Sequence, residues 1–140
     1  MFQYQNLTLA QVKNLASGLA DQLGLRNVII GLVGPLGAGK TVFAKAFAKT
    51  FGIKKTSSPT FVITHQHKIK FRHLYHLDFY RLQNRQQLAP LGLEEVLNGK
   101  NIVLIEWVDK FPTIKKRCDI LITLKVRPGN KRDVTITNKK

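Results

Sequence analysis

Cysteine is nearly missing from this 140-residue sequence, in which Cys118 is the only example. One cysteine cannot form an intrachain disulfide, and it cannot build a metal site from several thiolates. This usage fits a reducing compartment, so we expect the protein in the cytoplasm. At this length we expect a single domain over residues 1–140, with a hydrophobic core large enough to fold without cross-links.

A long apolar run is missing as well. The most apolar stretch, VIIGLVG (28–34), is far too short to cross a bilayer. The first residues, MFQYQNLTLAQ, contain no basic segment followed by a long apolar one, as a secretion signal would. We therefore expect neither membrane association nor secretion.

Acidic residues are scarce: 8 Asp and Glu stand against 23 Lys and Arg, and the formal net charge is +15. No acid lies between Asp21 and Asp78. An excess of positive charge favours a polyanionic partner such as nucleic acid, although lysines that only face solvent would give the same composition. Charge alone leaves both interpretations open.

The segment GPLGAGKT, residues 34–41, matches the G-x-x-x-x-G-K-[ST] pattern of phosphate-binding loops. It directly follows the unbroken apolar run 27–33, which we expect to be a strand buried on both faces. After it, Phe43, Phe47 and Phe51 line one stripe of an expected helix that ends at Gly52. Strand, glycine loop and helix form the context that the motif requires, so a plain turn is the weaker interpretation.

Hydrophobic periodicity and turn residues predict the remaining elements. Thr8 and Gln11 have the spacing of a capping box that opens an amphipathic helix over 8–23. The other expected elements are strands over 61–66 and 71–79 joined as a hairpin by a basic turn at 68–70, a short helix over 91–99, and strands over 102–105, 119–126 and 134–137. The predicted fold class is α/β: a P-loop NTPase-type three-layer sandwich with a mostly parallel central sheet and antiparallel additions.

In such a sheet the ligand crevice lies at the carboxyl ends of the central strands, where Gly34, Asp78 and Glu106 fall. Backbone N–H groups of the glycine loop would bind phosphate oxygens, helped by the positive end of the following helix dipole. Lys40 would reach the β- and γ-phosphates, and the Thr41 hydroxyl would be a ligand of Mg²⁺. The expected phosphate-binding residues are Gly34, Leu36, Gly37, Ala38, Gly39, Lys40 and Thr41.

Two carboxylates and one hydroxyl are candidates for the chemistry at the γ-phosphate. Glu106 directly follows a buried strand and could hold Mg²⁺ through a water, orient the attacking water, or do both. Asp78 could be a second carboxylate at the cation or the water, or else cap a helix or pair with Arg81. Thr60, in the SPT segment 58–60, could sense the γ-phosphate and Mg²⁺, or belong to a proline-stiffened turn.

Three other features are weaker indications of chemistry. The four histidines at 65, 67, 73 and 76 lack cysteine partners and a recognised ligand spacing, which disfavours zinc. NKRD (130–133) matches the guanine-reading N-K-x-D signature, but the companion D-x-x-G occurs only at 21–24, before the glycine loop, so the order of a GTPase is broken. Trp107 is expected to pack in the sheet and has no predicted chemistry.

The chain resembles the TsaE (YjeE) family in five segments that agree in order and spacing: GPLGAGKT (34–41), SPTF (58–61), HLDFYRL (76–82), LGLEEVL (91–97) and IEWVD (105–109). The resemblance implies a small bacterial ATPase needed for threonylcarbamoyl modification of the adenosine beside the anticodon in tRNAs. It implies ATP at the glycine loop, Mg²⁺ held by Thr41 and Glu106, and Asp78 in the catalytic switch region. Thr60 matches the family's SPT threonine, and the Thr8 region and Arg132 match segments near the nucleotide base.

The resemblance also implies partners, namely the TsaD and TsaB proteins, and tRNA contacted directly or through their complex. Arg81 is a candidate for an arginine finger in cis, and we expect slow ATP turnover alone and faster turnover with partners. Two other functions stay open on the sequence. One is a small-molecule kinase, for which no lid segment stands out, and the other is a non-catalytic nucleotide-sensing, RNA-binding module.

Overall fold

A mixed β-sheet runs through the computed structural model, which describes residues 1–54 and 63–139. Within these residues seven strands lie in the order β1-β7-β6-β2-β5-β4-β3. The strands are β1 (Phe2–Leu7), β2 (Val28–Val33), β3 (Ile63–Ile69), β4 (Arg72–Asp78), β5 (Asn101–Glu106), β6 (Ile120–Arg127) and β7 (Lys131–Asn138). The helices are α1 (Leu9–Leu23), α2 (Lys40–Lys49), α3 (Leu93–Asn98) and α4 (Pro112–Lys115), with 3₁₀ turns at Arg85–Gln87, Ala89–Leu91 and Val108–Lys110.

The centre of the sheet is parallel. β2 pairs in parallel with β5 on one side and with β6 on the other, and β4 pairs in parallel with β5. The additions are antiparallel: β7 to β6, β1 to β7 and β3 to β4. The predicted α/β class is therefore confirmed. Because parallel strands end on the same side, β2, β4 and β5 bring their carboxyl ends together, and the segments that follow them meet there.

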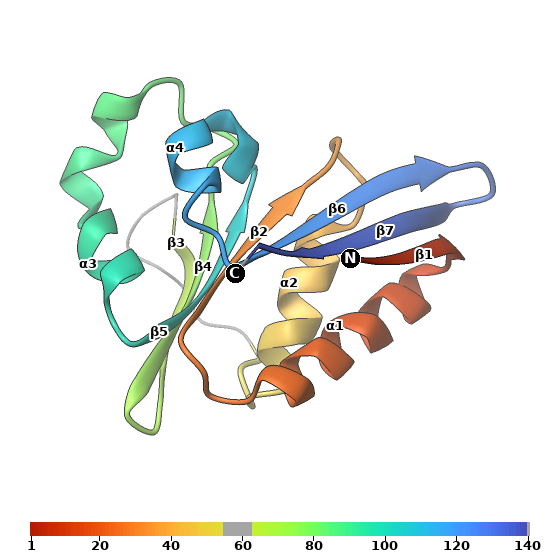
Figure 1. Ribbon diagram of the computed structural model, residues 1–140, viewed down its shortest axis with the longest axis horizontal. Helices are drawn as coiled ribbons and strands as arrows, with labels where there is room; N and C mark the ends of the chain where they lie inside the picture. The colour runs from red at the N-terminus through yellow and green to blue at the C-terminus, as the bar shows by residue number, and fades with distance from the viewer. Residues whose placement is uncertain (55–62, 140) are drawn as a thin grey trace.

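Helices cover both faces of the sheet, α1 and α2 on one face and α3 and α4 on the other (Figure 1). β2 contributes to both cores. Ile30 and Leu32 belong to the cluster that α1 and α2 complete. Ile29 and Val33 pack against the cluster that α3 and α4 complete. A strand covered on both sides has no solvent face, which explains why its sequence is an unbroken apolar run.

The first helix forms as predicted. The Thr8 hydroxyl accepts a hydrogen bond from the Gln11 backbone N–H at 3.1 Å, and the Gln11 side chain accepts one from the Thr8 N–H at 2.8 Å. This reciprocal capping box satisfies N–H groups that the first turn cannot pair internally. Val12, Ala16 and Ala20 form the fully buried stripe that packs α1 on the sheet. No helix in the described ranges is both long enough and apolar enough to span a bilayer.

The β3–β4 hairpin forms, but its turn begins two residues later than the predicted turn at 68–70. Lys68 pairs with His73 and Ile69 pairs with Arg72, so the ladder includes the first two residues of the basic segment. The turn is Lys70–Phe71, in which Lys70 has a φ of 54°. Charged side chains are tolerated in this ladder because it lies at the edge of the sheet, where Lys68 is exposed.

Strand β1 is an element that sequence reasoning missed. It adds to the sheet edge through backbone pairing with β7, with Phe2 opposite Ile136 and Tyr4 opposite Val134. Its side chains are almost all exposed, so its sequence lacks the alternation of buried and exposed residues by which a strand is recognised. The neighbouring β7 also begins earlier than predicted, at Lys131.

Gly31 in β2 is a position where even a methyl group does not fit. A Cβ there would lie 2.7 Å from Val108 Cγ1, 2.8 Å from Leu121 Cδ2 and 2.9 Å from Cys118 Sγ. Gly31→Ala is therefore expected to lower the free energy of unfolding by about 1–3 kcal/mol, since packed side chains must shift. Gly18 is the matched control: it is exposed in α1, and a Cβ there would meet nothing within 4 Å.

We expect Gly18→Ala to raise the free energy of unfolding by up to about 1 kcal/mol, because alanine favours a helix and restricts the unfolded chain. Urea unfolding followed by circular dichroism measures both variants. Two changes of the same sign would contradict the packing described for Gly31.

Candidate functional site

The glycine loop lies between the end of β2 at Val33 and the start of α2 at Lys40. Gly37 and Gly39 have φ angles of 80° and 106°, which side chains rarely adopt, and this explains the glycines. The loop borders a cavity of about 300 Å³ at the carboxyl ends of the central strands. Predicted residues that line this cavity are Leu36, Gly37, Gly39, Lys40, Thr41, Asp78, Glu106 and Arg132.

Three residues that were predicted to bind the nucleotide do not line this cavity. Gly34 and Ala38 contribute through their carbonyls, which accept hydrogen bonds from the side chains of Lys40 and Arg132. Thr8 is the N-cap of α1, and its neighbour Leu9 lines the cavity instead. Thr60 lies outside the described residues.

Lys40 is held at the centre of the site, with only 4% of its surface exposed. Its Nζ donates to the carbonyl oxygens of Gly34 at 2.5 Å and Pro35 at 2.8 Å. The same ammonium lies 4.1 Å from the centre of the Trp107 ring, a cation–π contact. Burial lowers the pKa of Lys40, while nearby carboxylates, first of all that of Glu106, oppose this change.

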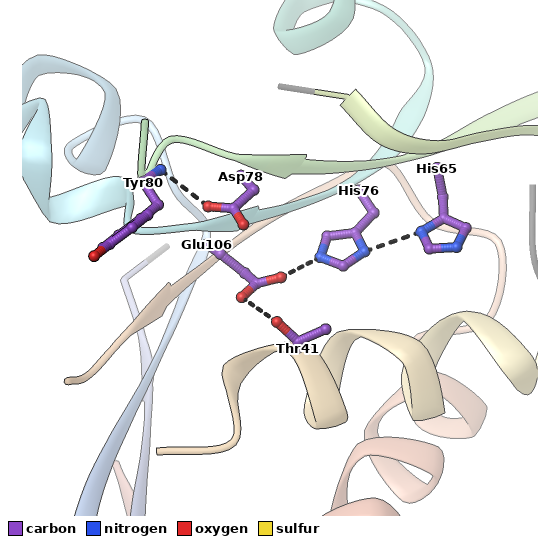
Figure 2. A network of polar contacts seen from close by, with 6 residues as sticks. All are labelled: Thr41, His65, His76, Asp78, Tyr80 and Glu106. Atoms are coloured by element: carbon purple, nitrogen blue, oxygen red, sulfur yellow. Dashed lines mark hydrogen bonds and ion pairs between the residues drawn. The ribbon is translucent and has the colours of Figure 1, made fainter. Parts of the chain in front are cut away.

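Thr41 and Glu106, the two predicted metal ligands, are in direct contact. The Thr41 hydroxyl donates to Oε1 of Glu106 at 2.7 Å (Figure 2). Glu106 ends β5 and is 3% exposed. Burial acts to raise the pKa of Glu106, but hydrogen bonds and charge from His76, the bond from Thr41 and the charge of Lys40 together lower it below its ordinary value. The buried carboxylate is therefore ionised at neutral pH.

Asp78 is the second carboxylate of the site. It pairs in register with Glu106 across β4 and β5, so both side chains point to the same face. Asp78 Oδ1 accepts a hydrogen bond from the Tyr80 N–H at 2.9 Å. This local turn is what the structure shows in place of the helix cap or Arg81 pair considered from the sequence. Burial raises the pKa of Asp78, the Tyr80 bond lowers it, and the charge of Glu106 raises it.

The donor set fits Mg²⁺ delivered with a phosphate chain. Thr41 and Glu106 offer oxygen atoms, which this hard cation prefers, and Asp78 lies beside them. Across residues 1–54 and 63–139, no group of three or more His, Cys, Asp or Glu side chains is arranged to hold a metal ion. Magnesium in nucleotide sites needs only one or two protein ligands, because phosphate oxygens and waters supply the others.

Arg132 anchors the glycine loop by binding two of its backbone carbonyls. It lies on β7, is 6% exposed, and donates from Nε to the Ala38 carbonyl and from Nη2 to the Gly37 carbonyl, both at 3.2 Å. Its Nη1 donates to the backbone and side-chain oxygens of Asn130 at 2.7 and 2.9 Å. Because Arg132 binds the Gly37 and Ala38 carbonyls, the loop is held in the conformation that borders the cavity.

Two residues of the guanine-reading pattern NKRD, Asn130 and Asp133, make hydrogen bonds that stabilise the fold. Asn130 holds Arg132, as described, and Asp133 Oδ1 accepts a hydrogen bond from the Asn6 N–H at 3.0 Å. The segment forms the end of the turn after β6 and the beginning of β7. The segment thus has structural contacts of its own, and in the sequence the order of the GTPase motifs is broken.

Sequence reasoning missed two residues of the site. His76 contacts Glu106, and its signal was available: in HLYHLD it stands two residues before Asp78 and so shares its face of β4. Trp107 was expected in the sheet, which is wrong. It follows β5 in a left-handed conformation with a φ of 59°, lines the cavity, and lies 5.0 Å from the Tyr80 ring.

The sequence is similar to known proteins along most of its length. Residues 7–134 match the family described as "Threonylcarbamoyl adenosine biosynthesis protein TsaE". The tRNA threonylcarbamoyladenosine biosynthesis protein TsaE of Rickettsia bellii is 38% identical over 130 residues, which cover 91% of this chain and 89% of the relative. The protein of the same name from Bacillus subtilis is 34% identical over 110 residues, which cover 78% of this chain and 68% of the relative.

A solved structure shares the fold. The crystal structure of Bacillus subtilis YdiB superposes with a TM-score of 0.75 at 27% sequence identity, over 99% of this chain and 86% of that one. The superposition covers nearly the whole chain, so the likeness concerns the fold as a whole. On the match over residues 7–134 and the identities to its relatives, the chain belongs to the TsaE family.

Proposed function

We propose that this protein is the ATP-hydrolysing component of the cytoplasmic machinery that makes threonylcarbamoyladenosine (t6A) in tRNA, acting with TsaD and TsaB. One observation carries the hydrolytic part: the Thr41 hydroxyl of the glycine loop meets the buried carboxylate of Glu106 at 2.7 Å, with Asp78 in register beside it. The names of the relatives, which refer to t6A biosynthesis, support the pathway.

The loop is suited to a triphosphate. Backbone N–H groups at the start of α2 and the positive end of its dipole would attract phosphate oxygens. Lys40 adds a positive charge, whose attraction for phosphate is stronger in a buried site of low dielectric constant. Phosphate oxygens would replace the Gly34 and Pro35 carbonyls as partners of the Lys40 ammonium. Thr41 and Glu106 would hold Mg²⁺, which in such sites neutralises charge on the β- and γ-phosphates.

The two carboxylates have different environments, which suits different roles. Glu106 is buried, hydrogen-bonded and has a lowered pKa, so it keeps the charge that a cation requires. Asp78 lines the cavity and has a raised pKa, which makes it the better proton acceptor for a water attacking the γ-phosphate. We assign Glu106 to the metal and Asp78 to the water.

Hydrolysis would serve as a switch. Contacts from Thr60 and Asp78 to a γ-phosphate would be lost when phosphate leaves, so a docking surface for partners could change with the nucleotide state. The net charge of +15 favours tRNA nearby, reached directly or through the partner proteins.

Reconstitution tests the proposal. Purified chain, TsaD, TsaB, tRNA, ATP and Mg²⁺, with the threonylcarbamoyl donor, are expected to give t6A over many turnovers, and omission of this chain is expected to stop the reaction after few. Free phosphate release should be slow for the chain alone and at least several-fold faster with TsaD and TsaB, because partners order the switch.

Equal rates of phosphate release with and without TsaD and TsaB would contradict the proposal. Transfer of phosphate to a metabolite would instead indicate a kinase. Salt-dependent tRNA binding that survives Lys40→Ala, with no phosphate release, would indicate a nucleotide-sensing RNA-binding module.

A further inference from the structure

His76 is a buried polar side chain in direct contact with the site. It lies on β4 with 1% of its surface exposed, and its Nε2 is 2.5 Å from Oε2 of Glu106 (Figure 2). The other carboxylate oxygen, Oε1, receives the Thr41 hydroxyl. Each oxygen of Glu106 thus has its own donor, one from β4 and one from α2.

The contact with Glu106 calls for a proton on Nε2 of His76. An ionised carboxylate only accepts hydrogen bonds, so His76 Nε2 must donate. On the other side of the ring, His76 Nδ1 lies 3.3 Å from Nδ1 of His65 on β3, and the two rings are stacked with an interplanar angle of 4°. A proton on either of these two Nδ1 atoms satisfies this contact, and in both cases the Nε2 proton of His76 is directed at Glu106.

We propose that His76 is a positioning residue that holds the Glu106 carboxylate in the orientation needed to present Oε1 to the Thr41 hydroxyl and the Mg²⁺ of bound nucleotide. This inference rests on the proposed function, since it concerns the same phosphate site. His65 supports it from the neighbouring strand by fixing the ring of His76.

The physical reason is conformational. A glutamate side chain has several rotatable bonds. Any orientation other than the productive one lowers the fraction of molecules in which Oε1 is placed to bind the metal. A hydrogen bond from a buried ring on an adjacent strand selects one orientation before nucleotide arrives. The same N–H group offsets the desolvation of a carboxylate that is 3% exposed. Outer partners of this kind change metal affinity or activity by about 10–100-fold when removed.

The test compares three variants on β4. His76→Leu removes the N–H group, His76→Gln keeps an N–H donor at a similar reach, and His73→Leu is the matched control, because His73 points to the opposite face of the strand. The fluorescence of Trp107, the only tryptophan, follows ATP binding as Mg²⁺ is titrated, and again in EDTA. Thermal melting establishes that each variant is folded.

We expect His76→Leu to raise the Mg²⁺ concentration needed for half-maximal ATP binding by about 10–100-fold, with binding in EDTA unchanged. His76→Gln is expected to restore most of this loss, and His73→Leu to match the wild type. Unchanged Mg²⁺ dependence in His76→Leu would overturn the proposal. So would a His76→Gln variant that melts like the wild type but is as defective as His76→Leu, since the ring would then act only through packing.

A measurement without nucleotide separates this inference from the proposed function. In ¹⁵N-histidine NMR spectra of the wild-type protein, His76 is expected to carry a proton on Nε2, and this signal is expected to shift in Glu106→Gln. An Nε2 atom without a proton, or an Nε2 signal that does not change in Glu106→Gln, would overturn the positioning role. Failure of the wild type to bind Mg²⁺–ATP, with the expected NMR result, would count against the proposed function alone.

Discussion

Replacing Glu106 by Gln is expected to reduce ATP hydrolysis by on the order of 10²–10³-fold, while nucleotide still binds. The substitution keeps the size and hydrogen-bonding reach of the side chain and removes only its charge. The surroundings of Glu106 favour this charge. Burial alone would raise the pKa of Glu106, but hydrogen bonds from His76 and Thr41 and the charge of Lys40 bring the pKa below its ordinary value. A neutral amide holds a divalent cation poorly, so phosphate release should suffer far more than binding.

Malachite-green detection of released phosphate measures this change, and calorimetric titration with ATP measures binding. Glu95→Gln is the control, because Glu95 is an exposed residue of α3 on the other face of the sheet. It is expected to hydrolyse ATP at the wild-type rate. Full activity in Glu106→Gln would rule out the role assigned to this carboxylate.

Loss of the loop lysine is expected to have the largest effect on binding. Lys40→Met should weaken ATP binding by about 100-fold or more, because two hydrogen bonds from an ammonium to phosphate oxygens contribute about 1.5–3 kcal/mol each. Methionine retains an unbranched side chain for the space beside Trp107, so the variant tests the charge more than the packing. Hydrolysis should fall below detection, since under the proposed function the same charge would face the β- and γ-phosphates.

Calorimetry and the ATP-dependent rise in melting temperature both report this loss, because a ligand that binds only the folded state stabilises it. Lys45→Met serves as the control on the same helix, where Lys45 is exposed. It removes one positive charge from α2 without touching the cavity. If Lys40→Met and Lys45→Met weakened ATP binding equally, the effect would come from net charge and the loop assignment would be wrong.

The central strands and the loop are predictable because their signals are local. β2 and β5 are unbroken apolar runs, and such runs indicate strands covered on both faces. The glycines of 34–41 occupy conformations that side chains rarely adopt, so the motif itself specifies the loop. Glu106 is predictable for the same reason: it stands at the end of an obvious strand, on the side where parallel strands bring their ends together.

The residues that sequence reasoning missed depend on contacts between distant segments. β1 exists because it pairs with β7, far along the chain, and its exposed side chains carry no sign of this. The spacing of His76 to Asp78 shows that they share a face of β4, but the contact of His76 with Glu106, 30 residues later in the sequence, depends on the pairing of β4 with β5. Trp107 leaves the sheet because the backbone turns left-handed directly after β5, a conformation that few residues other than glycine adopt.

The guanidinium of Arg132 reaches carbonyls 94 and 95 residues earlier in the chain. A ribosome releases residues in order, so the glycine loop emerges well before the side chain that braces it. Strand β7 must emerge and pair with β6 before this brace can form. The glycine loop thus acquires its contacts with Arg132 among the last events of biogenesis, when the β6–β7 hairpin closes.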